Sequence, residues 1–457
     1  EATVSPSSLT FTNGNWNSAQ TVTVTGVNDN SVDGNQNTTI TMAVVDASSD
    51  DNFDGVSDQT VTATTTDDDT ALTSVNSTKT NGSYKVGEVI PINIIFNSQV
   101  TVSGTPQLTL ETGASDAVVN YSSGSGGFSL LFNYTVAAGN NSSDLDYAST
   151  GALALNGGSI NDADGNPATL TLPTPGAANS LGANKALVID TSAPSAFTTG
   201  AVTSVGGTVV ANYWNSTNTS ITVTVPVAND SSLTDGTIQL EANVASGGFE
   251  TFGSAYTIQG SDLNDDYVFS QNAGTFEALS SGLAESESVT FRAIITDKAG
   301  NSTTGTASST TITVDQTVPT VLYVTSSSAD GLYGTGDILG ILVFTSDTVT
   351  VTGTPQLTLE TGASDETVNY SSGSASSVLV FNYTVATDNA NSDLDYASTG
   401  ALALNGGTIN DTAGNPLTLT LATPGAANSL AANKALVIDA AAPTNQNTVF
   451  ASSVVDQ

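Results

Sequence analysis

The chain has 457 residues, 38% hydrophobic and 11% charged, and its formal net charge is −37 because 43 Asp and Glu outnumber 6 Lys and Arg. This negative charge repels nucleic-acid phosphates and anionic membrane surfaces, so we expect no nucleic-acid partner. The chain contains no Cys and no His, which excludes thiolate nucleophiles, zinc sites built from Cys and His, and Ser-His-Asp triads. We therefore expect a protein that is not an enzyme.

Residues 1–70 predict a partial module. Their strand-like segments are too few to close a sandwich, which needs about seven strands. The segment ends in the acidic run Asp67, Asp68 and Asp69, and Asp29 and Asp33 precede it in the chain. We interpret this region as the back half of a domain whose acidic end faces the next domain.

An internal repeat occupies most of the remaining chain. The phrase VSGTPQLTLETGASD begins at Val102 and VTGTPQLTLETGASD begins at Val351, an offset of 351 − 102 = 249 residues. Self-similarity of this kind is typical of a modular array rather than of one large catalytic domain. We therefore predict two copies of one module, residues 71–190 and 316–439, with a different module, residues 191–315, between them.

Short apolar stretches separated by Gly, Asn and Pro predict the strands of these modules. In Leu130, Phe132, Tyr134 and Val136 the large apolar residues alternate, as expected for a strand with one buried face. The predicted strands of the first copy are 89–96, 107–111, 117–121, 129–136, 169–172 and 185–190, and those of the middle module are 220–225, 237–244, 288–296 and 310–314.

Each module ends in an Asp followed by a short linker, namely Asp190–Pro194, Asp315–Pro319 and Asp439–Pro443. Proline fixes its own φ and favours an extended preceding residue, so we expect stiff linkers that hold the modules end to end. Residues 440–457 predict the start of a further module. No stretch approaches the ~20 apolar residues of a membrane helix, so we expect no membrane insertion here and any export signal or anchor outside this segment.

The linkers and a second motif carry a resemblance. The second motif reads Ile-Asn-Asp-x-x-Gly-Asn-Pro at 160–167 and 409–416, and Ile-Thr-Asp-x-x-Gly-Asn at 295–301. Together they resemble bacterial immunoglobulin-like and cadherin-like repeats, and residues 1–70 are similar to a Calx-beta-type repeat. The resemblance implies an all-β fold, a tandem array of immunoglobulin-like β-sandwich domains. It also implies giant bacterial surface adhesins, in which calcium near domain junctions stiffens the chain.

Acidic residues near the predicted junctions are candidate calcium ligands, because Ca²⁺ takes roughly six to eight oxygens. Carboxylates that lie close together also require a cation or protonation. For the first copy, we combine Glu88, Asp144, Asp146, Asp162, Asp164 and Asp190 into one set. The complete candidate list is Asp67, Asp68, Asp69, Glu88, Asp144, Asp146, Asp162, Asp190, Asp297, Asp315, Asp337, Asp393, Asp395, Asp411 and Asp439. In the alternative interpretation, Asp-x-x-Gly-Asn is simply a β-turn stabilised by its own side chains.

The residue types also allow two other site chemistries. Paired carboxylates could serve a glycosidase, but such an enzyme needs a deep cleft, and stacked sandwiches with short turns present loop tips instead. Trp16 and the pair Tyr213 and Trp214 could form a platform for sugars, although packing in a core or against an edge is the more common role of such aromatic residues. Neither pattern predicts a catalytic or carbohydrate site.

We interpret the chain as a structural and adhesive stalk segment of a large secreted protein on the bacterial cell surface. Its expected partners are the neighbouring modules of the same chain and a host or surface ligand. In one alternative, the segment belongs to an extracellular fibre or sheath that assembles through contacts with other copies. In another, it is the non-catalytic arm of a secreted enzyme. An isolated stalk fragment should stay monomeric, whereas a fibre segment should polymerise.

Overall fold

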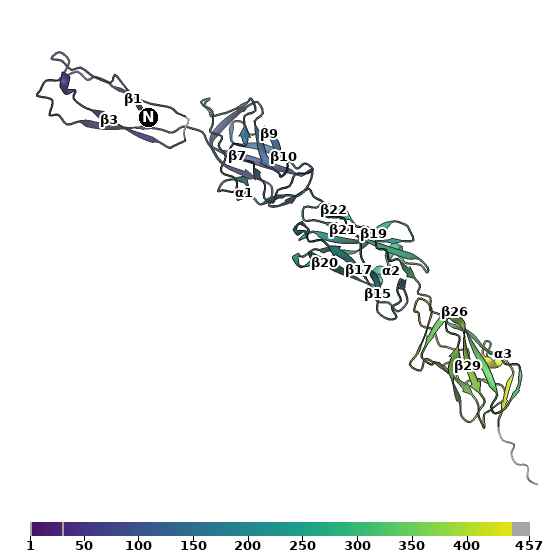
Figure 1. Ribbon diagram of the computed structural model, residues 1–457. Helices are drawn as coiled ribbons and strands as arrows, with labels where there is room; N and C mark the ends of the chain where they lie inside the picture. Colours follow the sequence, from purple (N-terminus) through teal and green to yellow (C-terminus); the bar gives the residue numbers. More distant parts are fainter. Residues whose placement is uncertain (1, 30–31, 441–457) are drawn as a thin grey trace, which may run out of the picture. The chain divides into compact units, whose positions relative to one another are not determined.

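The computed structural model describes residues 2–29 and 32–440, so the predicted further module at 440–457 lies almost entirely outside the described residues. The fold is all-β, a tandem array of β-sandwich modules, which confirms the predicted fold class (Figure 1). The three α-helices of the described chain are single turns, α1 (Leu181–Asn184), α2 (Ala273–Glu277) and α3 (Leu430–Asn433). Within this part of the chain, no helix is long and apolar enough to cross a membrane.

Contacts divide the chain into two compact units. The first unit contains Glu1–Pro194 together with the short segment Thr296–Ser302, and the second contains Ser195–Ile295 and Thr303–Gln457. Three separate hydrophobic cores lie within the described residues, at 72–189, 202–314 and 324–438. The exact module boundaries given by the sequence remain a prediction.

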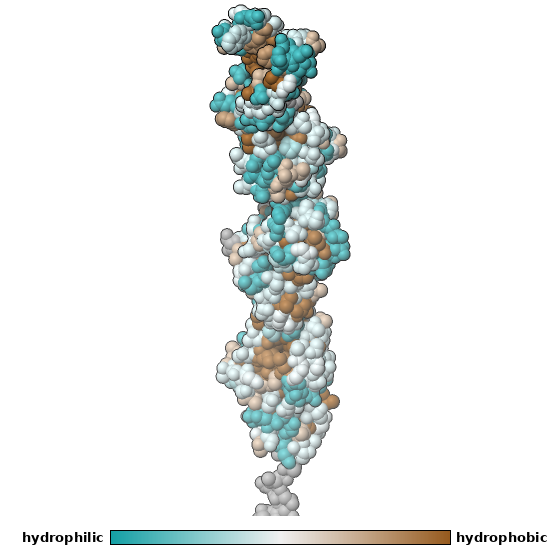
Figure 2. All heavy atoms as spheres, turned by 90° about the vertical axis from the view of Figure 1, so that its left-hand side faces the viewer, coloured by the Kyte–Doolittle hydropathy of each residue, from teal (hydrophilic) through white to brown (hydrophobic). Residues whose placement is uncertain are grey.

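The N-terminal region consists of two antiparallel strand pairs, β1 (Ala2–Ser5) with β2 (Thr23–Gly26), and β3 (Gln36–Met42) with β4 (Gln59–Thr65). No hydrophobic side chain of its described residues is buried. The side chain of Trp16 is 70% exposed. Figure 2 accordingly shows hydrophobic atoms at the surface of this region, at the top of the view. Isolated strand pairs of this kind have little stability by themselves.

The first copy of the repeat folds around its own core. Its strands are β5 (Leu72–Ser77), β6 (Gly82–Tyr84), β7 (Val89–Ser103), β8 (Gln107–Glu111), β9 (Ala117–Ser123), β10 (Gly127–Thr135), β11 (Asp146–Tyr147), β12 (Leu153–Ala154), β13 (Ser159–Asn161) and β14 (Leu187–Ile189). The main sheet has the order β11-β8-β9-β10-β7-β13, with β12 beside β8 and β5 beside β7. A separate parallel pair joins β14 to β6.

The second copy repeats this arrangement. Its strands are β24 (Val321–Ser326), β25 (Gly331–Tyr333), β26 (Ile338–Thr352), β27 (Gln356–Glu360), β28 (Glu366–Ser372), β29 (Ser376–Thr384), β30 (Ala390–Asn391), β31 (Asp395–Tyr396), β32 (Leu402–Ala403), β33 (Thr408–Asn410) and β34 (Leu436–Asp439). In both copies one long strand, β7 or β26, pairs with several neighbours in succession. The equal sheet order follows from the sequence repeat.

The middle module has two sheets, in the orders β15-β17-β20 and β16-β23-β21-β18-β19, with β22 beside β21. Its strands are β15 (Val202–Val205), β16 (Tyr213–Trp214), β17 (Ser220–Val227), β18 (Thr237–Val244), β19 (Phe249–Thr257), β20 (Asp265–Asn272), β21 (Ser288–Thr296), β22 (Ser302–Thr304) and β23 (Ile312–Val314). Every second residue of β17 and β18 is buried, so alternation in the sequence places one face of each strand in the core.

Most predicted strands of the first copy are present, but the one at 169–172 is not. Thr169 forms only an isolated bridge with Ala71, and Pro167 forms another with Asn161. The Thr-Leu-Thr-Leu alternation is real, and Leu172 is buried. Proline residues at 167 and 173 flank this segment, and because Pro lacks an amide donor, a continuous ladder does not form there. The strand prediction was wrong at this position.

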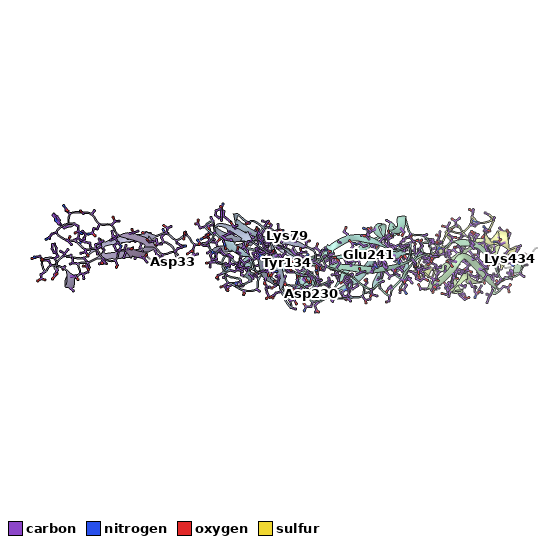
Figure 3. The ribbon with its side chains drawn as sticks, turned by 90° about the horizontal axis from the view of Figure 1, so that it is seen from above. Asp33, Lys79, Tyr134, Asp230, Glu241 and Lys434 are labelled. Carbon is purple, nitrogen blue, oxygen red and sulfur yellow. The ribbon has the colours of Figure 1, made fainter. Side chains whose placement is uncertain are left out.

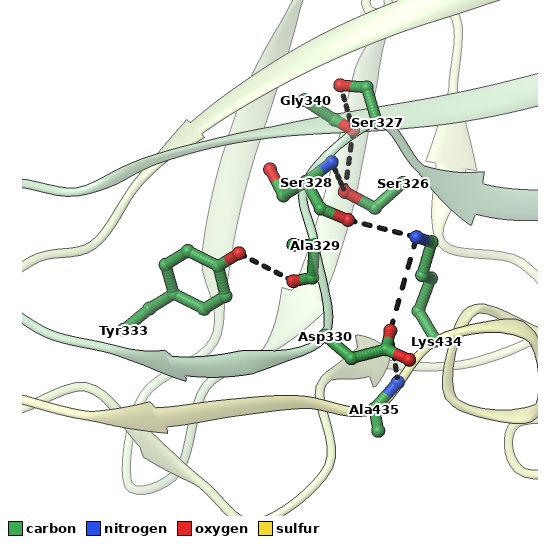
Figure 4. Close-up of polar contacts among 9 residues, drawn as sticks. All are labelled: Ser326, Ser327, Ser328, Ala329, Asp330, Tyr333, Gly340, Lys434 and Ala435. Atoms are coloured by element: carbon green, nitrogen blue, oxygen red, sulfur yellow. Dashed lines mark hydrogen bonds and ion pairs between the residues drawn. The ribbon is translucent and has the colours of Figure 1, made fainter.

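One lysine braces the same loop in each copy of the repeat. In the second copy, Lys434 Nζ donates a hydrogen bond to the carbonyl oxygen of Ser328 at 3.0 Å and lies 4.0 Å from Asp330 Oδ1 (Figure 4). In the first copy, Lys185 Nζ donates to the carbonyl oxygen of Lys79 at 3.0 Å. Two of the six basic residues in the chain, Lys185 and Lys434, therefore bond the equivalent loop in the two copies.

Replacing Lys434 with methionine should destabilise the second copy by about 1 to 2 kcal/mol, because a partly buried charged hydrogen bond is lost. Thermal unfolding of the full chain measures this change. Asp330→Asn is the matched control, since the 4.0 Å ion pair to a side chain that is 63% exposed should contribute under about 0.5 kcal/mol. Equal losses in the two variants would contradict a role for the carbonyl contact.

Candidate metal sites and linker junctions

The Asp-x-x-Gly-Asn motif of the first copy forms a self-contained turn after β13. Asp162 Oδ1 accepts hydrogen bonds from the backbone amides of Asp164 at 2.9 Å and Asn166 at 2.8 Å. Asp162 Oδ2 accepts the side-chain amide of Asn166 at 3.1 Å. Burial opposes ionisation of Asp162, but these hydrogen bonds outweigh it and lower the pKa of the carboxyl group. Both carboxylate oxygens are thus engaged within the turn.

The same turn recurs at the other two positions of the motif. Asp297 Oδ1 accepts the backbone amide of Asn301 at 2.8 Å, and its Oδ2 accepts the Asn301 side chain at 2.9 Å. Asp411 makes the same two contacts with Asn415 at 2.8 and 2.9 Å. The three carboxylates therefore have the role that the β-turn interpretation assigned to them.

The Asn of the turn also contacts the linker, which the sequence did not suggest. In the second unit, Asn415 Nδ2 donates to the carbonyl oxygen of Asp315 at 2.9 Å, and Asn415 Oδ1 accepts the backbone amide of Ser216 at 2.7 Å. Asn415 is fully buried. A third bond runs from Asn215 Nδ2 to the carbonyl oxygen of Ala413 at 2.7 Å. One side chain thus joins the turn, the linker and the loop after β16.

A glycine makes this close contact possible. Gly414 lies in the left-handed region at φ +97°, and a Cβ atom there would approach Asn215 Nδ2 to 2.9 Å. Both the backbone conformation and the proximity of the loop require a residue without a side chain. The Gly of Asp-x-x-Gly-Asn therefore serves the junction as well as the turn.

A corresponding contact occurs within the first unit. Asn301 Nδ2 donates to the carbonyl oxygen of Asp190 at 3.0 Å, and Lys85 Nζ donates to the carbonyl oxygen of Gly300 at 2.8 Å. Asn415 and Asn301 thus each donate to the backbone carbonyl of an Asp, and each of these Asp residues begins a linker that ends in Pro. The only available sequence signal was the joint recurrence of the motif and the linker phrase.

Two predicted ligands, Asp315 and Asp411, are brought together at the junction of the second unit. Burial, and after it the charge of Asp411, raises the pKa of Asp315. The Asn415 side-chain nitrogen lies between them, 2.9 Å from Asp411 Oδ2 and 3.4 Å from Asp315 Oδ1. An amide donor therefore occupies the place between the carboxylates, and it offsets part of their repulsion.

The largest gathering of predicted ligands lies at the end of the N-terminal region. Asp29, Asp33 and the run Asp67, Asp68 and Asp69 line one pocket of about 20 Å³, enough for a single particle the size of a water molecule. Partial burial, and after it the charges of Asp67, Asp29, Asp68 and Asp33, raises the pKa of Asp69. Asp29 and Asp33 therefore lie around the same pocket as the acidic run, and a metal site formed by them stays a prediction.

The combined set predicted for the first copy is divided between two ends of the module. Glu88 precedes the start of β7 and forms an ion pair with Lys79 at 3.0 Å. Seven residues beyond Val89, Phe96 pairs with Leu72, near the Asp162 turn. At about 3.3 Å per strand residue the two ends are roughly 23 Å apart. A single site containing both Glu88 and Asp162 therefore does not form.

The remaining candidates are spread over several places in the two copies of the repeat. Asp144 and Asp146 face the first turn of α1, where a Cβ on Gly182 would lie 3.4 and 3.0 Å from their Oδ2 atoms. Asp146 Oδ2 accepts the amide of Gly176 at 2.9 Å, and its repeat counterpart Asp395 accepts that of Gly425 at 2.8 Å. The others are Asp393 just before β31, Asp337 as a turn acceptor for the Gly334 amide, Asp190 as an acceptor for the Ser192 amide, and Asp439 at the end of β34.

Among the described residues, no group of three or more acidic side chains is arranged as a set of metal ligands. The turn carboxylates already accept two or more N–H groups each. The aspartates of the N-terminal region differ from the turn carboxylates in that five of them line one pocket. Which individual residues bind calcium remains a prediction.

No protein-family model matches the chain, and no curated protein matches it. Similar solved structures include one described as concerning host cell surface retention of a 1.5-MDa bacterial ice-binding adhesin, at 13% identity and a TM-score of 0.31, covering 75% of this chain and 93% of that chain. Another is a mutant of Salmonella alpha-2-macroglobulin, at 7% identity and a TM-score of 0.18, covering 75% of this chain and 22% of that chain.

Proposed function

We propose that this chain is a stalk segment of a secreted bacterial surface protein, in which serial sandwiches hold an adhesive part away from the cell. The observation that carries the proposal is the buried junction of the second unit, where Asn415 bonds both the Asp315 carbonyl and the Ser216 amide. A linker that is braced on two sides resists bending. Recurrence of this contact at Asp190 and Asn301 in the first unit supports the same mechanical role.

Composition supports the proposal from an independent direction. The surface carries few charges other than carboxylates, and the chain lacks the Cys and His residues of most catalytic sites. Such a surface suits an extracellular spacer, since a high net charge of one sign keeps long molecules soluble and apart. The expected partners are neighbouring modules of the same chain and a ligand bound elsewhere in the protein.

We propose calcium as a stiffening ion at the N-terminal pocket. Asp29, Asp33 and the three consecutive aspartates would supply its carboxylate oxygens. Partial burial and, after it, the charges of these neighbours raise the pKa of Asp69, and a divalent cation would relieve their mutual repulsion. Calcium in the protein would thereby order the connection that leads into β5.

Calcium is expected to raise the unfolding temperature of the full chain relative to the same chain in EDTA. At a hundredfold excess over the dissociation constant, the stabilisation is about 2.7 kcal/mol. Asp69→Asn should reduce this gain, whereas Asp266→Asn, at an exposed position in β20, should leave it unchanged. Acidification toward pH 3.8, the ordinary pKa of Asp, should abolish the gain, because Asp69, with its raised pKa, is protonated early in this titration.

Small-angle scattering on the same samples tests the mechanical part of the proposal. A stalk should remain monomeric and become more extended, or less variable in length, when calcium is added. An unchanged unfolding temperature would remove calcium from the proposal and leave turn chemistry as the source of stiffness. Concentration-dependent polymerisation would instead support the fibre alternative.

A further inference from the structure

The main sheet of the first copy splits between β9 and β10. These neighbours pair only at Leu131 with Ser123 and at Phe132 with Tyr121, with a register shift between the two pairs. Earlier in β9, residues 117–120 pair with β8, and later in β10, residues 133–135 pair with β7. The two strands therefore follow different neighbours and separate from one another.

The split opens a groove of about 660 Å³, lined by residues 115–122 of the β9 side and by Asn133, Tyr134, Thr135, Ala137 and Asn140. Across the groove, Asn133 Nδ2 donates to Ser122 Oγ at 3.2 Å. On the β10 side, the buried hydroxyl of Tyr134 (labelled in Figure 3) donates to Asn140 Oδ1 at 2.9 Å. Burial raises the pKa of Tyr134 to about 12, so this bond persists at all physiological pH values. The first of these bonds joins the two sides of the groove, and the second fixes Tyr134 to Asn140 on one side.

Backbone groups of β9 face the groove. The amide of Tyr121 donates to the Pro106 carbonyl on the β8 side. In an antiparallel ladder, successive residues direct their N–H and C=O groups to alternate sides. The groups of Val119 therefore face β8 as well, and those of Val118 and Asn120 face the groove. Val118 is 57% exposed, so its strand edge is accessible.

Backbone groups of β10 face the groove from the other side. The amide of Val136 donates to the Glu88 carbonyl next to β7, so by the same alternation the groups of Asn133 and Thr135 point away from β7. Pro91, which has no amide to donate, lies opposite Asn133, as this alternation requires. β9 and β10 pair with each other at Leu131 with Ser123 and at Phe132 with Tyr121. Apart from these two pairs, no strand among the described residues pairs with the groove-facing edge of β9 or β10.

The dimensions fit one short strand. A residue in a sheet occupies a slot of about 3.3 by 4.8 by 10 Å, roughly 160 Å³, so the groove corresponds to about four extended residues. This number agrees with residues 117–120, the part of β9 that pairs with β8 and not with β10. An inserted strand would run antiparallel to β9 and satisfy edge groups that otherwise remain available for pairing.

We propose that this groove is a binding site for an extended peptide segment of a partner protein, one that carries basic and no acidic side chains next to a stretch of alternating β-branched residues. The lining contains Asp116 and no Lys or Arg, and the whole chain has a net charge of −37. A second copy of this chain is disfavoured by the same charge. The peptide adds a strand to β9 through the backbone of Val118 and Asn120.

The probe is a labelled seven-residue peptide of alternating valine and threonine with a lysine at each end, titrated into the full chain and followed by fluorescence anisotropy. Hydrogen exchange locates the site, and slower exchange is expected at the amides of Val118 and Asn120. A peptide with glutamate ends should bind at least about tenfold more weakly because of the acidic surface. A peptide with N-methylated amides, which cannot form the ladder, should also lose about tenfold.

Two variants of one residue test the strand edge in the protein. Val118→Pro removes a groove-facing amide while leaving the β8 bonds of Val119 intact, and should weaken binding about tenfold. Val118→Thr keeps the amide and introduces the residue of the second copy, Thr367, so affinity should stay within about threefold of the original.

Some outcomes would overturn the proposal. If the N-methylated peptide bound as tightly as the unmodified peptide, the proposal would be wrong. This test holds even if Val118→Pro fails to fold. Protection of the same amides by a neutral hexasaccharide alone would make the groove a carbohydrate site. Protection that rises with the concentration of the chain itself would make it an interface between copies.

Discussion

Replacing Asn415 with alanine is expected to destabilise the second unit by about 2 to 4 kcal/mol, because several buried polar groups lose their partner at once. The side chain is fully buried and bonds the Asp315 carbonyl, the Asp411 carboxylate and the Ser216 amide. The most direct readout is hydrogen exchange at the Ser216 amide. Its protection should fall on the order of 30-fold or more, the factor that corresponds to about 2 kcal/mol.

The repeat itself provides the matched control. Asn166 occupies the position 249 residues earlier, and its side chain bonds Asp162 within its own turn at 3.1 Å. Asn166→Ala should therefore cost only about 1 kcal/mol. If the two variants lost equal stability, Asn415 would act through its turn alone and the braced junction would not contribute. A larger loss for Asn415→Ala would establish that the junction contributes to stability.

Replacing Trp214 with alanine is expected to destabilise the middle module by about 3 to 5 kcal/mol, the usual effect of removing a large aromatic side chain from a core. Trp214 is fully buried and packs against Phe276 with ring centroids 4.7 Å apart. Its Nε1 donates to Glu277 Oε1 at 3.1 Å. Urea unfolding of the full chain, followed by circular dichroism because both variants lack Trp214, measures the effect in comparison with Trp214→Phe.

Trp16 is the control for this prediction, since its side chain is 70% exposed. Trp16→Ala should change stability by less than about 0.5 kcal/mol. A large loss in that variant would mean that the N-terminal region has a packed structure in solution. The burial of Trp214 also argues against a sugar platform at this residue, since a fully buried ring offers no face for a ligand to stack on.

Turn chemistry and calcium binding make different demands on the same aspartates. A turn uses carboxylate oxygens as acceptors for N–H groups, as Asp162, Asp297 and Asp411 do. Calcium coordination requires carboxylate oxygens that are not already accepting hydrogen bonds, together with several further oxygen ligands. The Asp-x-x-Gly-Asn motif therefore serves the fold first, and the N-terminal aspartates are the better candidates for an ion because so many of them share one pocket.

Local sequence patterns predicted most of the strands. Alternation placed Leu130, Phe132 and Tyr134 in a core, and all three are buried, because the side-chain period of a strand is set by its own backbone. The same reasoning failed at 169–172, where Pro residues at both ends interrupt a ladder. The alternation of hydrophobic residues alone does not show whether a neighbouring strand is available for backbone hydrogen bonding.

The sequence by itself determined the all-β fold and the repeat offset of 249 residues, since each depends on neighbours in the chain or on comparison of one copy with the other. It offered the turn at each Asp-x-x-Gly-Asn motif only as the alternative to calcium ligation. Only the tertiary structure decided that Asn415 reaches Asp315, 100 residues away, and that Glu88 and Asp162 lie at opposite ends of one module. It also decided that β9 and β10 separate. Such facts depend on how strands pair across long stretches of chain, and the residue types within each strand do not specify those partners.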